Sequence, residues 1–149
     1  MSYTEEMSKK LNELLEKNYD AEKGYQKAAE VVDNSSLQKF FEDQAANRYD
    51  FGHELKKEIK GYGEAPDKGG SAAGAAHRTW MDIKSTFTSN DEEAILAEVQ
   101  RGEKQALEEY DEIIHDTTLP PTTQKILKKQ RDSVQNAVRS AQNFEAFVS

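Results

Sequence analysis

Six polar side chains stand at positions where the surrounding helical pattern places apolar residues. They are Asn18, Glu22, Gln44, Arg48, Glu103 and Gln130. A polar group in a protein interior needs hydrogen-bonding partners, and a buried charge needs an opposite charge. With helix connections near residues 34 and 119, all six fall at similar levels along a helical bundle. We therefore predict that they meet in a buried polar network in its middle layer.

Carboxylates in the middle of such a bundle can also hold metal ions. Ferritin-like bundles bind two of them with a Glu from each of two helices and a Glu-x-x-His from each of the other two. The residues that come nearest to this ligand set are Glu22, Asp50, His53 and Glu103. The chain has only three histidines and none in its last predicted helix, so the complete set cannot be assembled.

Arg48 offers a different chemistry for the same layer. Glu22 and Glu103 would repel each other if both were buried as anions without a cation. The guanidinium of Arg48 has five N–H donors and can neutralise carboxylates, while amide side chains satisfy the remaining polar groups. Arginine would then take the place of the metal ions. We favour this structural network over a metal site; a third interpretation is that some of the six positions are exposed.

The elements that must position these residues are helices. Apolar residues recur at helical spacing, without the alternation typical of strands, in segments of about 3–32, 36–62, 71–88, 91–116 and 121–147. Ser35-x-x-Gln38 is expected to cap the second helix. Short connections make two antiparallel hairpins, and residues 63–90 are enough to cross the bundle. We predict one all-α domain over 1–149, a ferritin-like antiparallel four-helix bundle whose long crossover carries a fifth, shorter helix.

Composition limits the partners and the compartment. The 149 residues carry a formal net charge of −8 and no cysteine, which excludes disulfides and thiolate metal sites and disfavours nucleic acid as a partner. The first residues have neither a basic region nor an apolar stretch, so we do not expect a secretory signal. No apolar run is long enough for a membrane span. No nucleophile or phosphate-binding motif is recognisable, so no catalytic residue is predicted. We expect a cytoplasmic protein that binds neither nucleic acid nor membrane.

The predicted crossover helix carries a motif of its own, His77-Arg78-x-Trp80, after a run of small residues. We expect Trp80 to be buried, with His77 hydrogen-bonded on the same face. The alternative for His77 is a role as a ligand, a proton carrier or an interface contact. Arg78 is expected to point away and to pair with an acidic helix surface.

The first and fourth predicted helices match each other weakly. Superposing Tyr25 on Tyr110 places Asn18 on Glu103, and it also aligns nearby leucines and alanines. This correspondence suggests a duplicated hairpin.

Three motifs together resemble a bacterial ferritin-like family of unknown function. They are Asp20-x-Glu22-Lys23-Gly24-Tyr25, then Gly70-Ser71-x-x-Gly74-x-x-His77-Arg78-x-Trp80, and Arg101-Gly102-Glu103 before Tyr110. The resemblance implies a ferritin-like bundle and singles out Glu22, His77 and Glu103, but it implies no particular activity. By analogy with ferritins, position 18 would be a glutamate, and here it is Asn18.

These observations lead to one expected function and two alternatives. We expect a non-enzymatic, dimeric and, by analogy, stress-associated bundle without a cofactor, in which a polar network replaces a degenerate metal layer. The first alternative is a di-iron-type carboxylate protein that holds iron or another divalent metal and has oxidase or storage activity. The second is a homo-oligomeric interaction module that associates through the small-residue helix over 71–88.

Overall fold

Four long helices make up the described structure. The computed structural model describes residues 2–66, 92–115 and 119–148. In these ranges the helices are α1 (Tyr3–Val31), α2 (Ser35–Gly61), α4 (Glu92–Ile114) and α5 (Pro121–Val148). They confirm the four long helices that the apolar spacing predicts. The predicted helix over 71–88, with His77, Arg78 and Trp80, lies outside the described residues.

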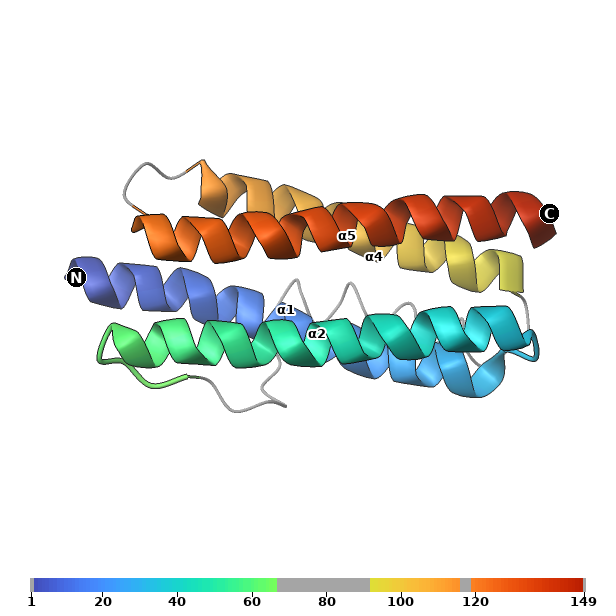
Figure 1. Ribbon diagram of the computed structural model, residues 1–149, viewed down its shortest axis with the longest axis horizontal. Helices are drawn as coiled ribbons and strands as arrows, with labels where there is room; N and C mark the ends of the chain where they lie inside the picture. Colours follow the sequence, from blue (N-terminus) through green and yellow to red (C-terminus); the bar gives the residue numbers. More distant parts are fainter. Residues whose placement is uncertain (1, 67–91, 116–118, 149) are drawn as a thin grey trace.

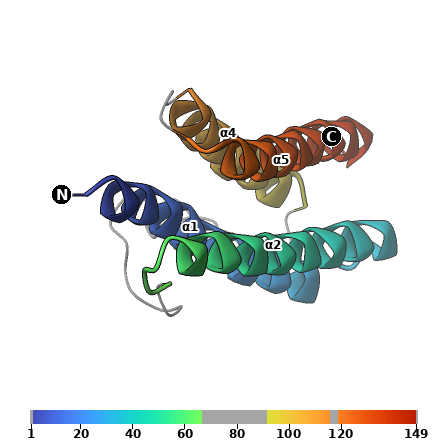
Figure 2. The same cartoon turned by 60° about the vertical axis from the view of Figure 1, so that its left-hand side comes forward.

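The helices form two antiparallel hairpins that pack against each other. Helix α2 runs back along α1, and α5 runs back along α4 (Figure 1). Turned by 60°, the hairpins appear as two layers, in which α1 faces α4 and α2 faces α5 (Figure 2). Helices α2 and α4 run in the same direction, so α2 ends at the opposite end of the bundle from the start of α4. This topology is that of the predicted ferritin-like bundle.

The tight connection between α1 and α2 depends on a capping residue that differs from the predicted one. Asn34 has extended backbone and accepts a hydrogen bond from the Leu37 backbone N–H at 3.1 Å. Gln38 Nε2 donates to the Val32 carbonyl at 2.7 Å. The predicted capping box starting at Ser35 is therefore wrong. Asparagine is a preferred N-cap, and here its side chain satisfies a free N–H of the first turn.

The apolar core is divided into two clusters. One cluster contains buried residues from 7–15 of α1 and 51–59 of α2. The other contains buried residues from 21–28 of α1, Val32 just after it, and 37–45 of α2. Helix α4 contributes buried residues from 106–114 to the first cluster and from 95–99 to the second, and α5 contributes Leu127 and Val134 to the first and Ala141 to the second. Asn18, Arg48 and Glu103 lie between the two clusters on α1, α2 and α4, so buried polar side chains separate two apolar halves. No helix in the described ranges is long and apolar enough to cross a membrane.

Removing the cap should destabilise the bundle, whereas changing the residue after it should not. We expect Asn34→Ala to lower the free energy of unfolding by about 1 kcal/mol, because a helix N–H loses its acceptor. Asn34→Ser should keep most of the stability. Urea unfolding measures this loss, and the dependence of the unfolding free energy on urea concentration should be the same in all variants. A larger loss for Ser35→Ala than for Asn34→Ala would contradict this assignment of the cap.

Candidate functional site

A buried ion pair crosses the centre of the bundle. The guanidinium of Arg48, on α2, donates from Nη2 to Glu103 Oε1, on α4. The side chains of Arg48 and Glu103 are 2% and 0% exposed. Helices α2 and α4 are diagonal neighbours, because α2 packs on α1 and α5. The pair therefore links the two hairpins through the bundle axis rather than along a helix interface.

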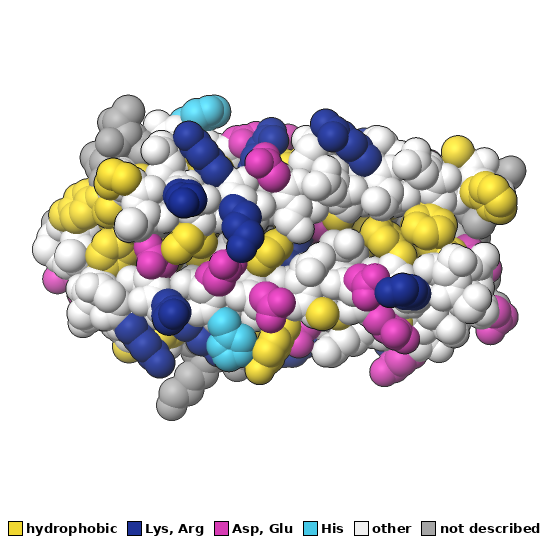
Figure 3. All heavy atoms as spheres, viewed as in Figure 1, with side chains coloured by type: hydrophobic (Ala, Val, Ile, Leu, Met, Phe, Trp, Pro, Cys, Tyr) yellow, Lys and Arg dark blue, Asp and Glu magenta, His cyan; other side chains and the backbone are white. Residues whose placement is uncertain are grey.

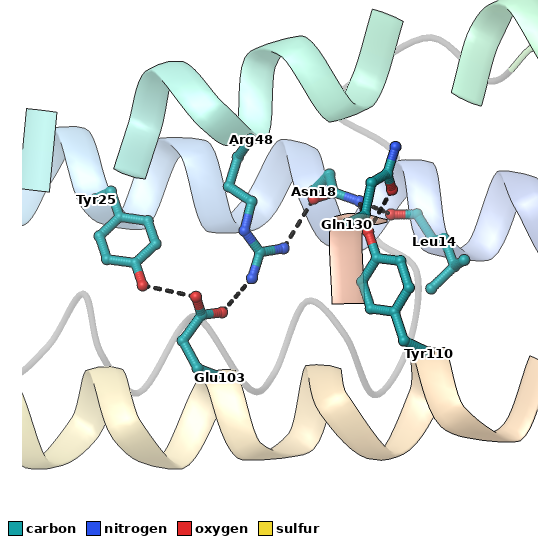
Figure 4. Close-up of polar contacts among 7 residues, drawn as sticks. All are labelled: Leu14, Asn18, Tyr25, Arg48, Glu103, Tyr110 and Gln130. Atoms are coloured by element: carbon teal, nitrogen blue, oxygen red, sulfur yellow. Dashed lines mark hydrogen bonds and ion pairs between the residues drawn. The ribbon is translucent and has the colours of Figure 1, made fainter. Parts of the chain in front are cut away.

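Each end of the ion pair has a further partner on α1 (Figure 4). Tyr25 Oη donates to Glu103 Oε2 at 2.8 Å. Arg48 Nη1 donates to Asn18 Oδ1 at 2.8 Å. Both carboxylate oxygens of Glu103 thus accept hydrogen bonds, one from a cation and one from a neutral phenol. Charge-assisted bonds of this kind are the strong ones in protein interiors.

The network continues from Asn18 to α5 and toward the surface. Asn18 Nδ2 donates to the Leu14 carbonyl at 2.9 Å and to Tyr110 Oη at 3.0 Å. Tyr110 Oη in turn donates to Gln130 Oε1 at 2.7 Å. Gln130 Nε2 donates to Glu54 Oε1 at 3.1 Å, and Glu54 is half-buried.

We call six of these residues the polar layer. Its members are Asn18, Tyr25, Arg48, Glu103, Tyr110 and Gln130. They come from all four described helices, and all six are buried. None of their atoms is among the buried side-chain N and O atoms that lack a hydrogen-bond partner in the described part of the chain. A fully satisfied layer of this kind rigidifies a core, whereas a half-satisfied one would be costly.

Burial and charge keep the protons of the layer in place. Burial raises the pKa of Tyr25 well above its ordinary value, and the neighbouring Glu103 carboxylate raises it further. Burial also raises the pKa of Tyr110 to about 12. Burial is the largest effect on Arg48 and would lower its pKa, but the charge and hydrogen bond of Glu103 together with the two tyrosines outweigh it, and the net shift is upward. At neutral pH the layer therefore holds a guanidinium cation and two neutral phenols.

The structure brings together four of the six polar residues singled out from the sequence: Asn18, Arg48, Glu103 and Gln130. Glu22 is different: it is half-buried, and its carboxylate accepts from Gln26 Nε2 at 3.3 Å. Gln44 is also half-buried. The expectation that these two join the buried network is wrong. Glu22 lies four residues after the inward Asn18, and Gln44 lies four residues before the inward Arg48. Four residues rotate a helix by about 40° beyond one full turn, which moves these two side chains toward the surface.

The suggested metal ligands do not converge. Asp50 and His53 are exposed on α2, whereas Glu103 is fully buried with Arg48 and Tyr25 on its two oxygens. In the described ranges, no group of three or more His, Asp or Glu side chains is arranged to hold a metal ion. A dication beside Glu103 would also meet the positive charge of Arg48. The residues present therefore do not fit the di-iron ligand set of ferritin-like bundles.

Two members of the layer are not among the polar residues that the sequence singles out. Tyr25 and Tyr110 fall on the apolar stripes of their helices, where a tyrosine ring packs like other aromatic side chains. One signal could have identified them. Tyr25 follows Asn18 by seven residues and Tyr110 follows Glu103 by seven. Seven residues are about two helical turns, which places each pair on one face.

Comparisons with known proteins identify a family and a similar fold. A family model described as Domain of unknown function (DUF2383) matches residues 6–116. Among solved structures, the bacterioferritin-related protein from Bacteroides fragilis, described as a dodecameric thioferritin, superposes with a TM-score of 0.80. It is 18% identical, and the alignment covers 97% of this chain and 87% of that one. A search of curated proteins gives no significant match. At this identity the likeness establishes the fold alone.

Removing the buried cation should destabilise the protein strongly. We expect Arg48→Met to lower the free energy of unfolding by about 3–5 kcal/mol at neutral pH, because Glu103 would remain buried without a counter-charge. Adding Glu103→Gln to that variant should recover much of the loss, since the amide oxygen can still accept from Tyr25. Denaturant unfolding of both variants is the measurement. An unchanged midpoint for Arg48→Met would show that the pair is not buried.

The raised tyrosine pKa values predict a loss of stability in alkali. A phenol whose pKa is higher in the folded state stabilises the fold fully below the unfolded-state pKa near 10, and that contribution is lost as pH rises through the folded-state value. For Tyr110, with a pKa of about 12, the contribution is on the order of 2–3 kcal/mol. We expect wild-type stability to fall more steeply than that of Tyr110→Phe between about pH 10 and 12. Parallel urea titrations would test this, and identical curves would contradict it.

Proposed function

Since the chain belongs to the family described as Domain of unknown function (DUF2383), we propose its role from its own residues: it is a non-enzymatic ferritin-like bundle. In this proposal the polar layer stands where related bundles hold metal ions, and it determines how the two hairpins dock. The protein then acts as a self-associating helical unit rather than as a metal oxidase.

One observation carries the proposal: both oxygens of the only carboxylate in the polar layer are occupied by donors from other helices. Glu103 accepts from Arg48 and from Tyr25. A carboxylate that serves a redox metal must offer an oxygen to it, and here Arg48 supplies the positive charge instead. A buried ion pair adds little net stability over apolar packing, but it can select one register of helices over others.

The alternative function is that of a metal-binding carboxylate protein of the di-iron type, with iron or another divalent metal and oxidase or storage activity. The shared fold with the Bacteroides fragilis thioferritin favours it. The donor set argues against it, because Asp50 and His53 lie exposed on the outside of α2, away from Glu103.

Self-association is the second part of the proposal. The Bacteroides fragilis protein is described as dodecameric. In this chain Phe147, on α5, is 89% exposed and Tyr49, on α2, is 53% exposed, so each leaves an aromatic ring available for contact with a second copy. The stress-related role expected from the sequence stays a prediction.

Metal analysis separates the two functions. Protein purified without chelator should contain far less than one equivalent of iron per chain, and anaerobic titration with Fe(II) should give no saturable tight binding. The Asp50→Asn/His53→Ala variant serves as a control for weak surface binding. Stoichiometric, tight Fe(II) binding that is lost in Glu103→Gln would overturn the proposal in favour of the metal protein.

A further inference from the structure

A groove of about 590 Å³ lies on the surface of the α1–α2 hairpin. It is lined by Glu22, Gln26, Ala29, Glu30, Glu42, Ala45, Ala46 and Tyr49. The three alanines leave space between the two helices, and Tyr49 adds an aromatic ring that is half exposed to solvent. We call this surface the α1–α2 groove.

The groove is acidic as well as partly apolar. Three carboxylates line it, and its described lining residues include no Lys, Arg or His. Glu22 accepts from a neutral amide at 3.3 Å, and the charges of Lys23, Lys56 and His53 act on it from outside the lining. The Lys27 ammonium lies 3.8 Å from the Glu30 carboxylate. Lys39 pairs with Asp43 at 3.1 Å rather than with Glu42. Burial raises the pKa of Glu22. An incoming cation would therefore be stabilised in this groove.

Helix α5 has the complementary charge. It contains five basic residues and two acidic ones, whereas α4 contains two basic and eight acidic ones. Of the four described helices, α5 alone has a net positive charge. Lys125, Lys128 and Arg139 are exposed on it. Their spacing follows one outward helical stripe. Figure 3 shows basic side chains spread over α5, and both basic and acidic side chains over α2.

We propose that the α1–α2 groove binds the basic stripe of α5 from a second copy of this chain. This proposal rests on the self-association proposed above and names its surface. Glu22 and Glu30 are eight residues apart, about 12 Å along α1, and Lys128 and Arg139 are about 16 Å apart along α5. The long basic side chains can converge on the carboxylates while their methylene groups cover the alanines.

The two surfaces belong to different hairpins (Figure 2), so the contact is heterologous. Each copy uses α5 to bind one neighbour and keeps its groove for another, which builds rings or open chains. A symmetric contact between two grooves would instead place carboxylates against carboxylates, and like charges at an interface oppose binding.

Two charge-reversed variants test the pairing. The first, Glu30→Lys/Glu42→Lys, reverses the groove. The second, Lys125→Glu/Lys128→Glu, reverses α5 and leaves Lys129, whose ammonium lies 3.7 Å from Glu54, in place. We expect each variant alone to associate at least tenfold more weakly than wild type in sedimentation velocity at low salt. A one-to-one mixture should associate again, because both of its contacts are complementary. High salt should weaken the wild-type assembly.

Matched controls reverse exposed charges elsewhere. Glu13→Lys on α1 and Lys104→Glu on α4 change the net charge in the same directions and should leave association unchanged. Circular dichroism should show that every variant is folded. A wild-type protein that stays monomeric at all concentrations would overturn the proposed self-association itself. A wild-type oligomer that the reversals do not weaken, or that the mixture does not restore, would overturn only the α1–α2 groove as its surface.

Discussion

The buried charge of Arg48 is the constraint on which the rest of the bundle depends. A guanidinium removed from water is tolerated only where an anion and further acceptors surround it. Glu103 and Asn18 supply these on α4 and α1, so three helices must keep one rotation and one level relative to each other. The apolar clusters on either side pack without such directional demands. The polar layer thus determines the register, and the apolar halves supply most of the stabilisation.

The polar layer is nearly symmetric between α1 and α4, and one carboxylate is enough to balance the charge of Arg48. Tyr25 contacts Glu103, and Tyr110 contacts Asn18, so the two matching tyrosines each face the partner position on the opposite helix. Arg48 bridges the two positions with one nitrogen for each. A second glutamate at position 18 would leave two anions for one cation. The amide of Asn18 accepts a bond without adding charge, and the pair stays neutral.

Two chains can share this fold at 18% identity because apolar periodicity forms the bundle, whereas the polar residues at its centre determine the chemistry. Apolar residues at helical spacing are enough to form two hairpins and dock them, and many sequences satisfy that requirement. The polar residues in the middle layer are free to differ as long as their charges and hydrogen bonds balance. The function of this chain therefore has to be argued from its own central residues and surface charges, since the fold is common to proteins of different function.

The sequence by itself determined the helices, the hairpin topology and the inward positions of Asn18, Arg48, Glu103 and Gln130, because helical periodicity acts over many residues. The sequence could not place Glu22. A rotation of about 40° around α1 separates it from the inward Asn18, and that rotation is enough to put its side chain at the edge of a groove instead of in the interior. It also left open what Tyr25 would do, because a phenol can act as an apolar ring or as a donor. Only the tertiary structure decided these points. A hydrogen bond forms only when atoms on different helices come within about 3 Å, and local sequence does not specify that distance.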